Sequence, residues 1–223
     1  MIKVLKLLTL TLLFITVFMA CSKSKYENRI WSEDNPPAYD WPDGQKYYYG
    51  GDKKIYIDEV PNKFVLRFDD KYRSAIQKSL QKNARILDIE LDDFNKIFTF
   101  TTTENTALKS LMEDFKKQSG IKSINPMYVY DNIYDKLEMS VTDEIIVQFK
   151  DNVSQNYEMH KKYQVEVKEH PYPGLFPQFH QIISVPLGAD ILGIANVYQE
   201  SGLVIYSQPN FISKIELAES LIQ

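Results

Sequence analysis

The side chains best suited to chemistry in this chain of 223 residues include three histidines spaced ten residues apart. His170 and His180 flank a segment with three prolines, so they could face each other across a hairpin, while His160 falls on an expected helix. Two facing histidines fall short of the three or four protein ligands that a zinc site requires. We therefore expect packing or surface roles for the histidines and no metal site.

Catalysis has little support in the sequence. The pairs Asp69-Asp70 and Asp92-Asp93 lie at expected turns, where carboxylates are usually solvated rather than poised as an acid and a base. The chain contains no Gly-x-Ser-x-Gly elbow, no His-Glu-x-x-His zinc motif and no glycine-rich phosphate loop. We expect a protein that is not an enzyme, with no catalytic residues and no cofactor.

The only cysteine, Cys21, stands at the end of an apolar N-terminal segment. Residues 1–20 carry two lysines and then a short apolar run, which is typical of a signal peptide and too short for a stable membrane span. Phe18-Met19-Ala20-Cys21 resembles a bacterial lipobox, and an ordinary signal peptide with an incidental cysteine is the alternative. The resemblance implies acylation of Cys21, so we expect a lipoprotein held at the outer membrane of the cell envelope by its lipid anchor alone.

The charge balance and the cysteine count exclude two classes of protein. The chain has a net charge of −4, and removal of the two signal lysines makes the mature part more acidic. Nucleic acid is therefore not an expected partner, because neutralising phosphates needs surplus lysine and arginine. A single cysteine excludes a disulfide framework in an exported chain.

Residues 21–55 are expected to be an irregular linker between the lipid and the domain. Prolines and glycines that favour turns interrupt the stretch, namely Pro36, Pro37, Pro42, Gly44, Gly50 and Gly51. Trp31, Trp41 and Tyr47–Tyr49 also lie here. These aromatic residues either pack onto the domain or stay partly exposed.

From residue 56 onward the sequence repeats a pattern. Residues 62–70 and 143–151 both carry apolar side chains at alternate positions, which indicates half-buried strands. The apolar set is Phe64, Leu66 and Phe68 in the first segment and Ile145, Val147 and Phe149 in the second. Each segment precedes a helical stretch, and further strands are expected at 84–90, 96–101, 165–169 and 181–185.

A second helix of each half follows one template. Leu108, Leu111, Met112 and Phe115 fall at i, i+3, i+4 and i+7, as do Ile191, Ile194, Ala195 and Tyr198. Each helix is followed by Ser-Gly and an apolar residue, so we expect Gly120 and Gly202 at C′ with positive φ. A final strand closes each half, at 121–128 and 203–211.

The resulting order is β-α-β-β-α-β, twice, with a period of about 80 residues. This order predicts an α+β fold of two tandem ferredoxin-like modules, at 56–130 and 137–212, with a tail at 213–223. A single larger α+β domain is the alternative.

Residues 200–212 carry a more specific motif, in which a helix ends in Ser-Gly and a Val-Ile-Tyr strand leads to Pro-Asn-Phe-Ile. Together with 143–150 and 185–191, this motif resembles the N-terminal prodomain of subtilisin-like serine proteases, especially of the fervidolysin type. The resemblance covers about residues 140–212. The first half is a weaker copy, with Asn125 before Pro126 instead of Pro-Asn.

In that family the prodomain is a ferredoxin-like module that acts as folding chaperone and inhibitor. Its open sheet face covers two helices of the protease, and its C-terminal tail enters the active cleft. Here eleven residues follow Ile212, where the family has a catalytic domain. The resemblance therefore implies a free-standing inhibitor or chaperone whose partner is a subtilisin-like serine protease. A non-inhibitory envelope protein with a binding or structural role is the alternative.

The expected contact surface follows from the alternation and from the resemblance. If Ile145 and Val147 face the helices, Ile146 faces away, and Ile182 and Val65 do the same on their strands. The apolar residues of such an open face need a partner, which could be the protease or simply the other repeat. The candidate partner-binding residues are Ile146, Ile182, Phe211, Ile212, Lys214, Ile215 and Leu217.

Overall fold

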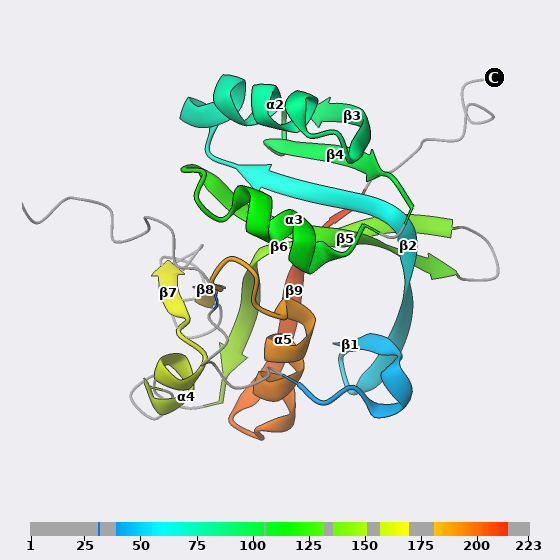
Figure 1. Ribbon diagram of the computed structural model, residues 1–223. Helices are drawn as coiled ribbons and strands as arrows, with labels where there is room; N and C mark the ends of the chain where they lie inside the picture. The colour runs from blue at the N-terminus through cyan, green and yellow to red at the C-terminus, as the bar shows by residue number, and fades with distance from the viewer. Residues whose placement is uncertain are drawn as a thin grey trace, which may run out of the picture.

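The computed structural model describes residues 31, 39–104, 106–131, 136–150, 157–169 and 181–213. Within them the fold mixes helix and sheet, and the strands pair antiparallel (Figure 1). The strands are β1 (Lys46–Gly50), β2 (Lys53–Phe68), β3 (Ile86–Asp92), β4 (Ile97–Thr102), β5 (Ile121–Asp131), β6 (Lys136–Phe149), β7 (Glu166–Glu169), β8 (Gln181–Ser184) and β9 (Val204–Ser213). The α-helices are α2 (Arg73–Lys82), α3 (Leu108–Phe115), α4 (Tyr157–Lys162) and α5 (Ile191–Glu200).

One sheet runs through both halves of the chain. Its strand order is β3-β4-β2-β5-β6-β8-β7, with β1 paired to β2 and β9 paired to β6. The two halves meet where β5 pairs with β6, with Tyr128 opposite Met139. No helix in the described part of the chain has the length and hydropathy needed to cross a membrane.

The first half buries its core between the sheet and the helices α2 and α3. Phe64, Leu66 and Phe68 of β2 lie in this core, as the alternation of the sequence predicts. Leu111 and Phe115 of α3 are 0% and 1% exposed, and the prediction of a helix over 108–115 is confirmed. The alternate apolar residues therefore form the buried face of the sheet.

The second half has its own core against α5. Ile145 and Val147 of β6 are fully buried there, and Phe149 is nearly so. Ile191, Ile194, Ala195 and Tyr198, the predicted face of α5, are all buried. The Asp190 carboxylate accepts a hydrogen bond from the Gly193 amide and caps this helix.

Strands β2 and β6 are longer than the sequence predicts. The outer end of β2 pairs with β1, while the start of β6 pairs with both β5 and β9. A register shift in the pairing of β2 with β5 lies between Glu59 and Phe64, where the other neighbour of β2 changes from β1 to β4. Asn62 at this point has a φ of 58°. The added residues at the start of β6 pair with β5 and so join the two halves. A sequence pattern that repeats within each half does not show this pairing.

The expectation of an irregular linker is wrong for residues 46–50 and 53–55, which belong to β1 and β2. Tyr47 of β1 is only 1% exposed, and its carbonyl accepts a hydrogen bond from the Asn196 side chain of α5. Trp31 and Trp41 also pack against the core of the second half. The aromatic residues of this stretch thus pack onto the domain, and the partner that orders them lies about 150 residues away in sequence.

Both predicted glycines have positive φ, 87° at Gly120 and 74° at Gly202. Gly202 directly follows Ser201, the C-cap of α5, so its place at C′ is confirmed. Helix α3 ends earlier than expected, with its C-cap at Lys116. Gly120 is therefore not at C′ of α3 but in the turn that leads into β5.

Candidate functional site

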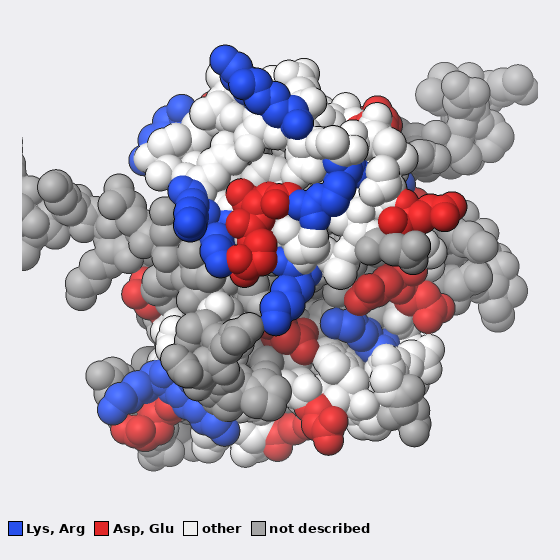
Figure 2. All heavy atoms as spheres, in the orientation of Figure 1, with Lys and Arg blue, Asp and Glu red and all other residues white. Residues whose placement is uncertain are grey.

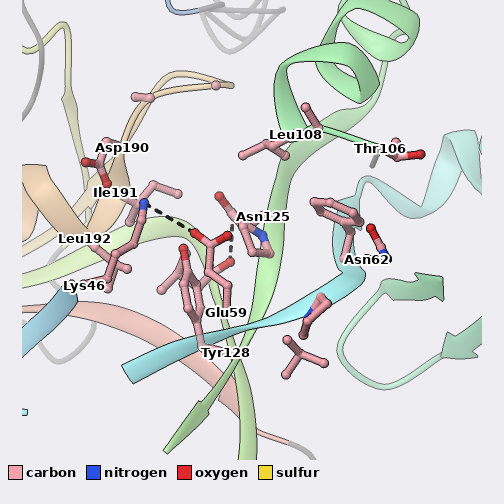
Figure 3. Close-up of a pocket in the computed structure, with 18 of the residues that line it drawn as sticks. Lys46, Glu59, Asn62, Thr106, Leu108, Asn125, Tyr128, Asp190, Ile191 and Leu192 are labelled. Carbon is pink, nitrogen blue, oxygen red and sulfur yellow. Dashed lines mark hydrogen bonds and ion pairs between the residues drawn. The ribbon is translucent and has the colours of Figure 1, made fainter. Parts of the chain in front are cut away.

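A pocket of about 660 Å³ lies at the junction of the two halves (Figure 3). The bulge of β2 around Pro61 and Asn62 forms one side, and the starts of α3 and α5 form others. Its apolar lining includes Phe64, Leu108 and Ile191. Volume, apolar walls and a position between structural units are typical of small-molecule sites.

Two opposite charges face each other at this pocket. The Lys46 ammonium lies 3.7 Å from a carboxylate oxygen of Glu59 and 5.3 Å from the centre of the Trp41 ring. The side chains of Lys46 and Glu59 are 29% and 50% exposed. Neighbouring strands hold them in place, since β1 carries Lys46 and β2 carries Glu59. This separation exceeds hydrogen-bond length, so the pair is a loose one.

Tyr128 of β5 lies opposite Glu59 in the sheet and lines the pocket from below. The residue is 3% exposed, and no hydrogen bond reaches its hydroxyl among the residues drawn in Figure 3. Burial, assisted by the negative charges of Glu59 and Asp190, raises the pKa of Tyr128 well above its usual range. The phenol therefore stays protonated and can donate a hydrogen bond into the pocket.

Asp190 closes the pocket at the start of α5. One of its carboxylate oxygens accepts from the Gly193 amide, and the other accepts from the Trp41 indole at 2.8 Å. Both oxygens thus accept a hydrogen bond from the protein. Glu59, whose contact with Lys46 is longer than a hydrogen bond, is the more available of the two pocket carboxylates for a ligand.

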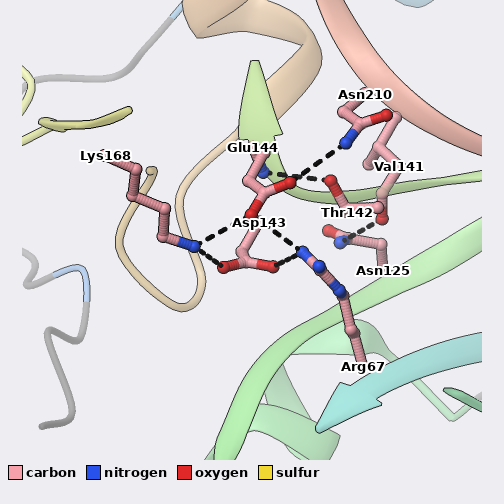
Figure 4. Close-up of polar contacts among 8 residues, drawn as sticks. All are labelled: Arg67, Asn125, Val141, Thr142, Asp143, Glu144, Lys168 and Asn210. Atoms are coloured by element: carbon pink, nitrogen blue, oxygen red, sulfur yellow. Dashed lines mark hydrogen bonds and ion pairs between the residues drawn. The ribbon is translucent and has the colours of Figure 1, made fainter. Parts of the chain in front are cut away.

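A second polar cluster connects the halves through the sheet (Figure 4). Arg67 of β2 lies 2.6 Å from Asp143 and 3.2 Å from Glu144 of β6. Lys168 of β7 reaches the same two carboxylates, at 3.2 and 2.9 Å. Asn210 of β9 also donates to Glu144, at 3.0 Å. Two cations and two carboxylates make the cluster neutral.

The cluster sets the protonation of its buried carboxylate. Burial alone would raise the pKa of Glu144, but the charges of Arg67 and Lys168 and the hydrogen bonds from Lys168 and Asn210 lower it to about 2. Burial opposes the charged forms of Arg67 and Lys168, yet the two carboxylates raise the pKa of both. Glu144, Arg67 and Lys168 therefore stay charged in the physiological range, which suits the cluster to holding strands together rather than to transferring protons.

The expected partner-binding residues do not gather in one place. Ile146 is half-buried on β6, and its backbone pairs with that of Ile182 on β8. Phe211 and Ile212 lie in β9, opposite Val141 and Ser140. Three of these residues, Lys214, Ile215 and Leu217, lie outside the described residues, as does Cys21, the expected lipidation site. The side chain of Ile182 is also outside what the structure describes.

The open face of the first half is covered from within the chain. Val65, expected to need a partner, is 4% exposed and clusters with Ile97 and Met127. Ile212 from the end of β9 packs against this cluster. Phe211 in turn contacts Tyr48, with ring centres 4.7 Å apart. Val65 is therefore covered by residues of both halves of the chain itself.

The histidines form no site in the described residues. His160 of α4 shares a 2.5 Å hydrogen bond through Nδ1 with the Tyr198 hydroxyl, and its buried Nε2 has no partner. Burial lowers its pKa. His170 and His180 lie outside the described residues. Within the described residues, no group of three metal-binding side chains occurs.

Sequence reasoning identified neither polar site. Lys46 and Glu59 fell near the boundary of the expected linker, and they meet Tyr128 only because β2 is longer than predicted. The adjacent acids Asp143 and Glu144, at the start of a strand, were the available signal for the second cluster. The face seen in Figure 2 mixes basic and acidic side chains, so it offers no single-sign patch as a further guide.

Comparisons with known sequences and structures found no match. No protein-family model, no curated protein and no solved structure matches it.

Proposed function

We propose that this chain is a cell-envelope lipoprotein of two tandem ferredoxin-like modules that binds and inhibits, or helps to fold, a subtilisin-like serine protease. Strand order supports the modules. The first half has the order β3-β4-β2-β5 and the second β7-β8-β6-β9. In each half the second, third, first and fourth strands of a β-α-β-β-α-β unit follow one another, which is the ferredoxin-like arrangement.

The observation that carries the function is the surface of the second half. Ile145 and Val147 are fully buried, whereas Ile146 between them is half-buried. On neighbouring β9, Ile205 is 50% exposed. Partly exposed apolar side chains on a sheet can contribute to a contact with a protein partner. Both residues lie in the half that resembles a subtilase prodomain.

The residues beyond β9 are the second proposed contact. Lys214, Ile215 and Leu217 continue an alternation of polar and apolar side chains that suits an extended strand in a protease cleft. Phe211 and Ile212 are less suited to that role, because they already pair with β6 and pack onto Tyr48 and Val65. The inhibitory segment therefore starts at Lys214.

The test is inhibition of a panel of subtilisin-like proteases by residues 22–223 and by a chain that ends at Ser213, which keeps β9 complete. We expect inhibition by the first and at least tenfold weaker inhibition by the second. Ile146→Lys should weaken inhibition to a similar degree, whereas Gln81→Lys, at an exposed site on α2, serves as the control. Equal inhibition by both chain lengths would discard the cleft contact.

A non-inhibitory binding or structural role in the envelope is the second candidate. The internal covering of Val65 by Ile212 favours it, since this contact removes one surface that a protease could have used. Absence of inhibition by the full chain, with retained folding by circular dichroism, would select this candidate.

The lipid anchor has its own test. Cys21→Ser removes the thiol that acylation requires, so the variant is expected in the soluble fraction while the parent chain sediments with membranes. Retention of the variant in the membrane fraction would contradict the lipoprotein assignment.

A further inference from the structure

The junction pocket contains an ion pair whose two groups do not form a hydrogen bond with each other. Lys46 and Glu59 are 3.7 Å apart, and no hydrogen bond joins them. An ammonium has three donors and a carboxylate about four acceptor sites, so each group keeps capacity for a ligand. Both groups lie at the pocket and are partly solvated, which leaves them accessible.

The spacing of this pair selects a type of ligand. A ligand that satisfies both groups must carry a cation and an anion within a few ångströms of each other. The ammonium and carboxylate on one α-carbon meet this requirement, whereas the charged ends of an extended peptide are farther apart. The charge pattern of the pocket therefore complements a free α-amino acid.

The remaining walls indicate the side chain of that ligand. Phe64, Leu108 and Ile191 give the pocket an apolar surface, and the volume of about 660 Å³ has room for a large group. Below them the Tyr128 hydroxyl supplies one more hydrogen-bond donor, suited to a carboxylate. A large apolar or aromatic side chain fills such a space better than a small or charged one.

We propose that the junction pocket binds a free α-amino acid with a large apolar or aromatic side chain, its ammonium at Glu59 and its carboxylate at Lys46 and Tyr128. This site is separate from the proposed protease contacts, which lie on Ile146, Ile205 and the residues beyond β9. The amino-acid binding test can therefore succeed or fail whether or not the protein inhibits a protease.

The test uses calorimetric titration of residues 22–223 with L-phenylalanine and two blocked forms of it. N-acetyl-L-phenylalanine lacks the ammonium, and L-phenylalanine amide lacks the carboxylate. We expect L-phenylalanine to bind and each blocked form to bind at least about threefold more weakly, as the loss of one partly exposed ion pair implies.

Two variants assign each end of the ligand. In Glu59→Gln the preference over the acetylated form should disappear while the preference over the amide remains, and Lys46→Gln should show the reverse. Lys78→Gln, an exposed site on α2, should leave both preferences unchanged. Unfolding midpoints of all variants check that the fold is kept.

Three outcomes would overturn the proposal. One is no heat of binding with L-phenylalanine at millimolar concentration in the folded parent chain. Another is equal binding of the free and blocked forms. Tighter binding of the dipeptide Phe-Phe than of phenylalanine, with the same dependence on Lys46 and Glu59, would reassign the pocket to peptides.

Discussion

The guanidinium of Arg67 lies 2.6 Å from the carboxylate of Asp143, although 76 residues separate them in sequence. Arg67 belongs to the first half and Asp143 to the second, so this ion pair fixes the two halves across the sheet. The Asp143 side chain is 7% exposed. Removal of one partner from a buried ion pair leaves the other partner without compensation.

Loss of Arg67 should therefore be costly. In Arg67→Met we expect the free energy of unfolding to fall by about 2–3 kcal/mol, below the full cost of an isolated buried charge because Lys168 still reaches Asp143. Urea unfolding measures the change. Arg73→Met is the matched control, since Arg73 pairs with Asp70 and Asp93, whose side chains are 55% and 63% exposed. The control should lose much less, because exposed ion pairs contribute little to stability, and equal losses would contradict a special role for the buried cluster.

Glu144 should make the free energy of unfolding depend on pH in the acidic range. Its pKa is about 2 in the folded chain against an ordinary value of 4.5, so the unfolded chain binds the proton more readily. The stabilisation is present above pH 4.5 and is lost as the pH falls toward 2. Urea midpoints of the parent and of Glu144→Gln should therefore differ most near pH 6 and converge toward pH 2. A difference that does not vary with pH would contradict the lowered pKa.

His160 should act in a higher pH range. Burial lowers its pKa below the ordinary 6.5, so the unfolded chain takes up the proton first as the pH falls. Stability should decline below about pH 6.5, before Glu144 begins to titrate. His160→Phe removes the titrating ring, and the change in urea midpoint between pH 7 and pH 5 should be smaller in this variant. His170 and His180 are common to both proteins and cancel in the comparison.

The two left-handed glycines should respond unequally to the same change. An added Cβ at Gly202 meets nothing within 4 Å, so Gly202→Ala has only the backbone penalty of about 1 kcal/mol. At Gly120 the added atom would lie 2.1 Å from the Tyr72 ring. Gly120→Ala should therefore lose at least about 1 kcal/mol more in urea unfolding. Replacing Tyr72 by alanine should reduce the difference between the two glycine variants, and an unchanged difference would show that the ring is not its cause.

Local pattern was enough to predict much of this fold. The helix over 108–115, the buried face of α5 and the positive φ of Gly202 all follow from spacing within a few turns of chain. Such features depend on near neighbours, whose effects a sequence displays directly.

The missing parts depend on contacts between distant segments. Strand β1 follows a stretch rich in proline and glycine, and only its contacts with α5 show why Tyr47 is buried. The pocket likewise requires the outer end of β2 to pair with both β1 and β5, which brings Tyr128, Glu59 and Lys46 to one place. No periodicity within a single segment specifies those pairings.

The hydroxyls of Tyr39 and Tyr49 lie 2.6 and 2.7 Å from the carboxylate of Glu200 at the end of α5. The residues at these contacts are 161 and 151 positions apart. During synthesis β1 can pair with β2 soon after both strands are made, whereas the contacts of Tyr39 and Tyr49 with Glu200 must wait until nearly the whole chain exists. Non-local contacts of this kind form late and slowly. The contacts that attach Tyr39 and Tyr49 to the end of α5 are therefore among the last of the fold to form.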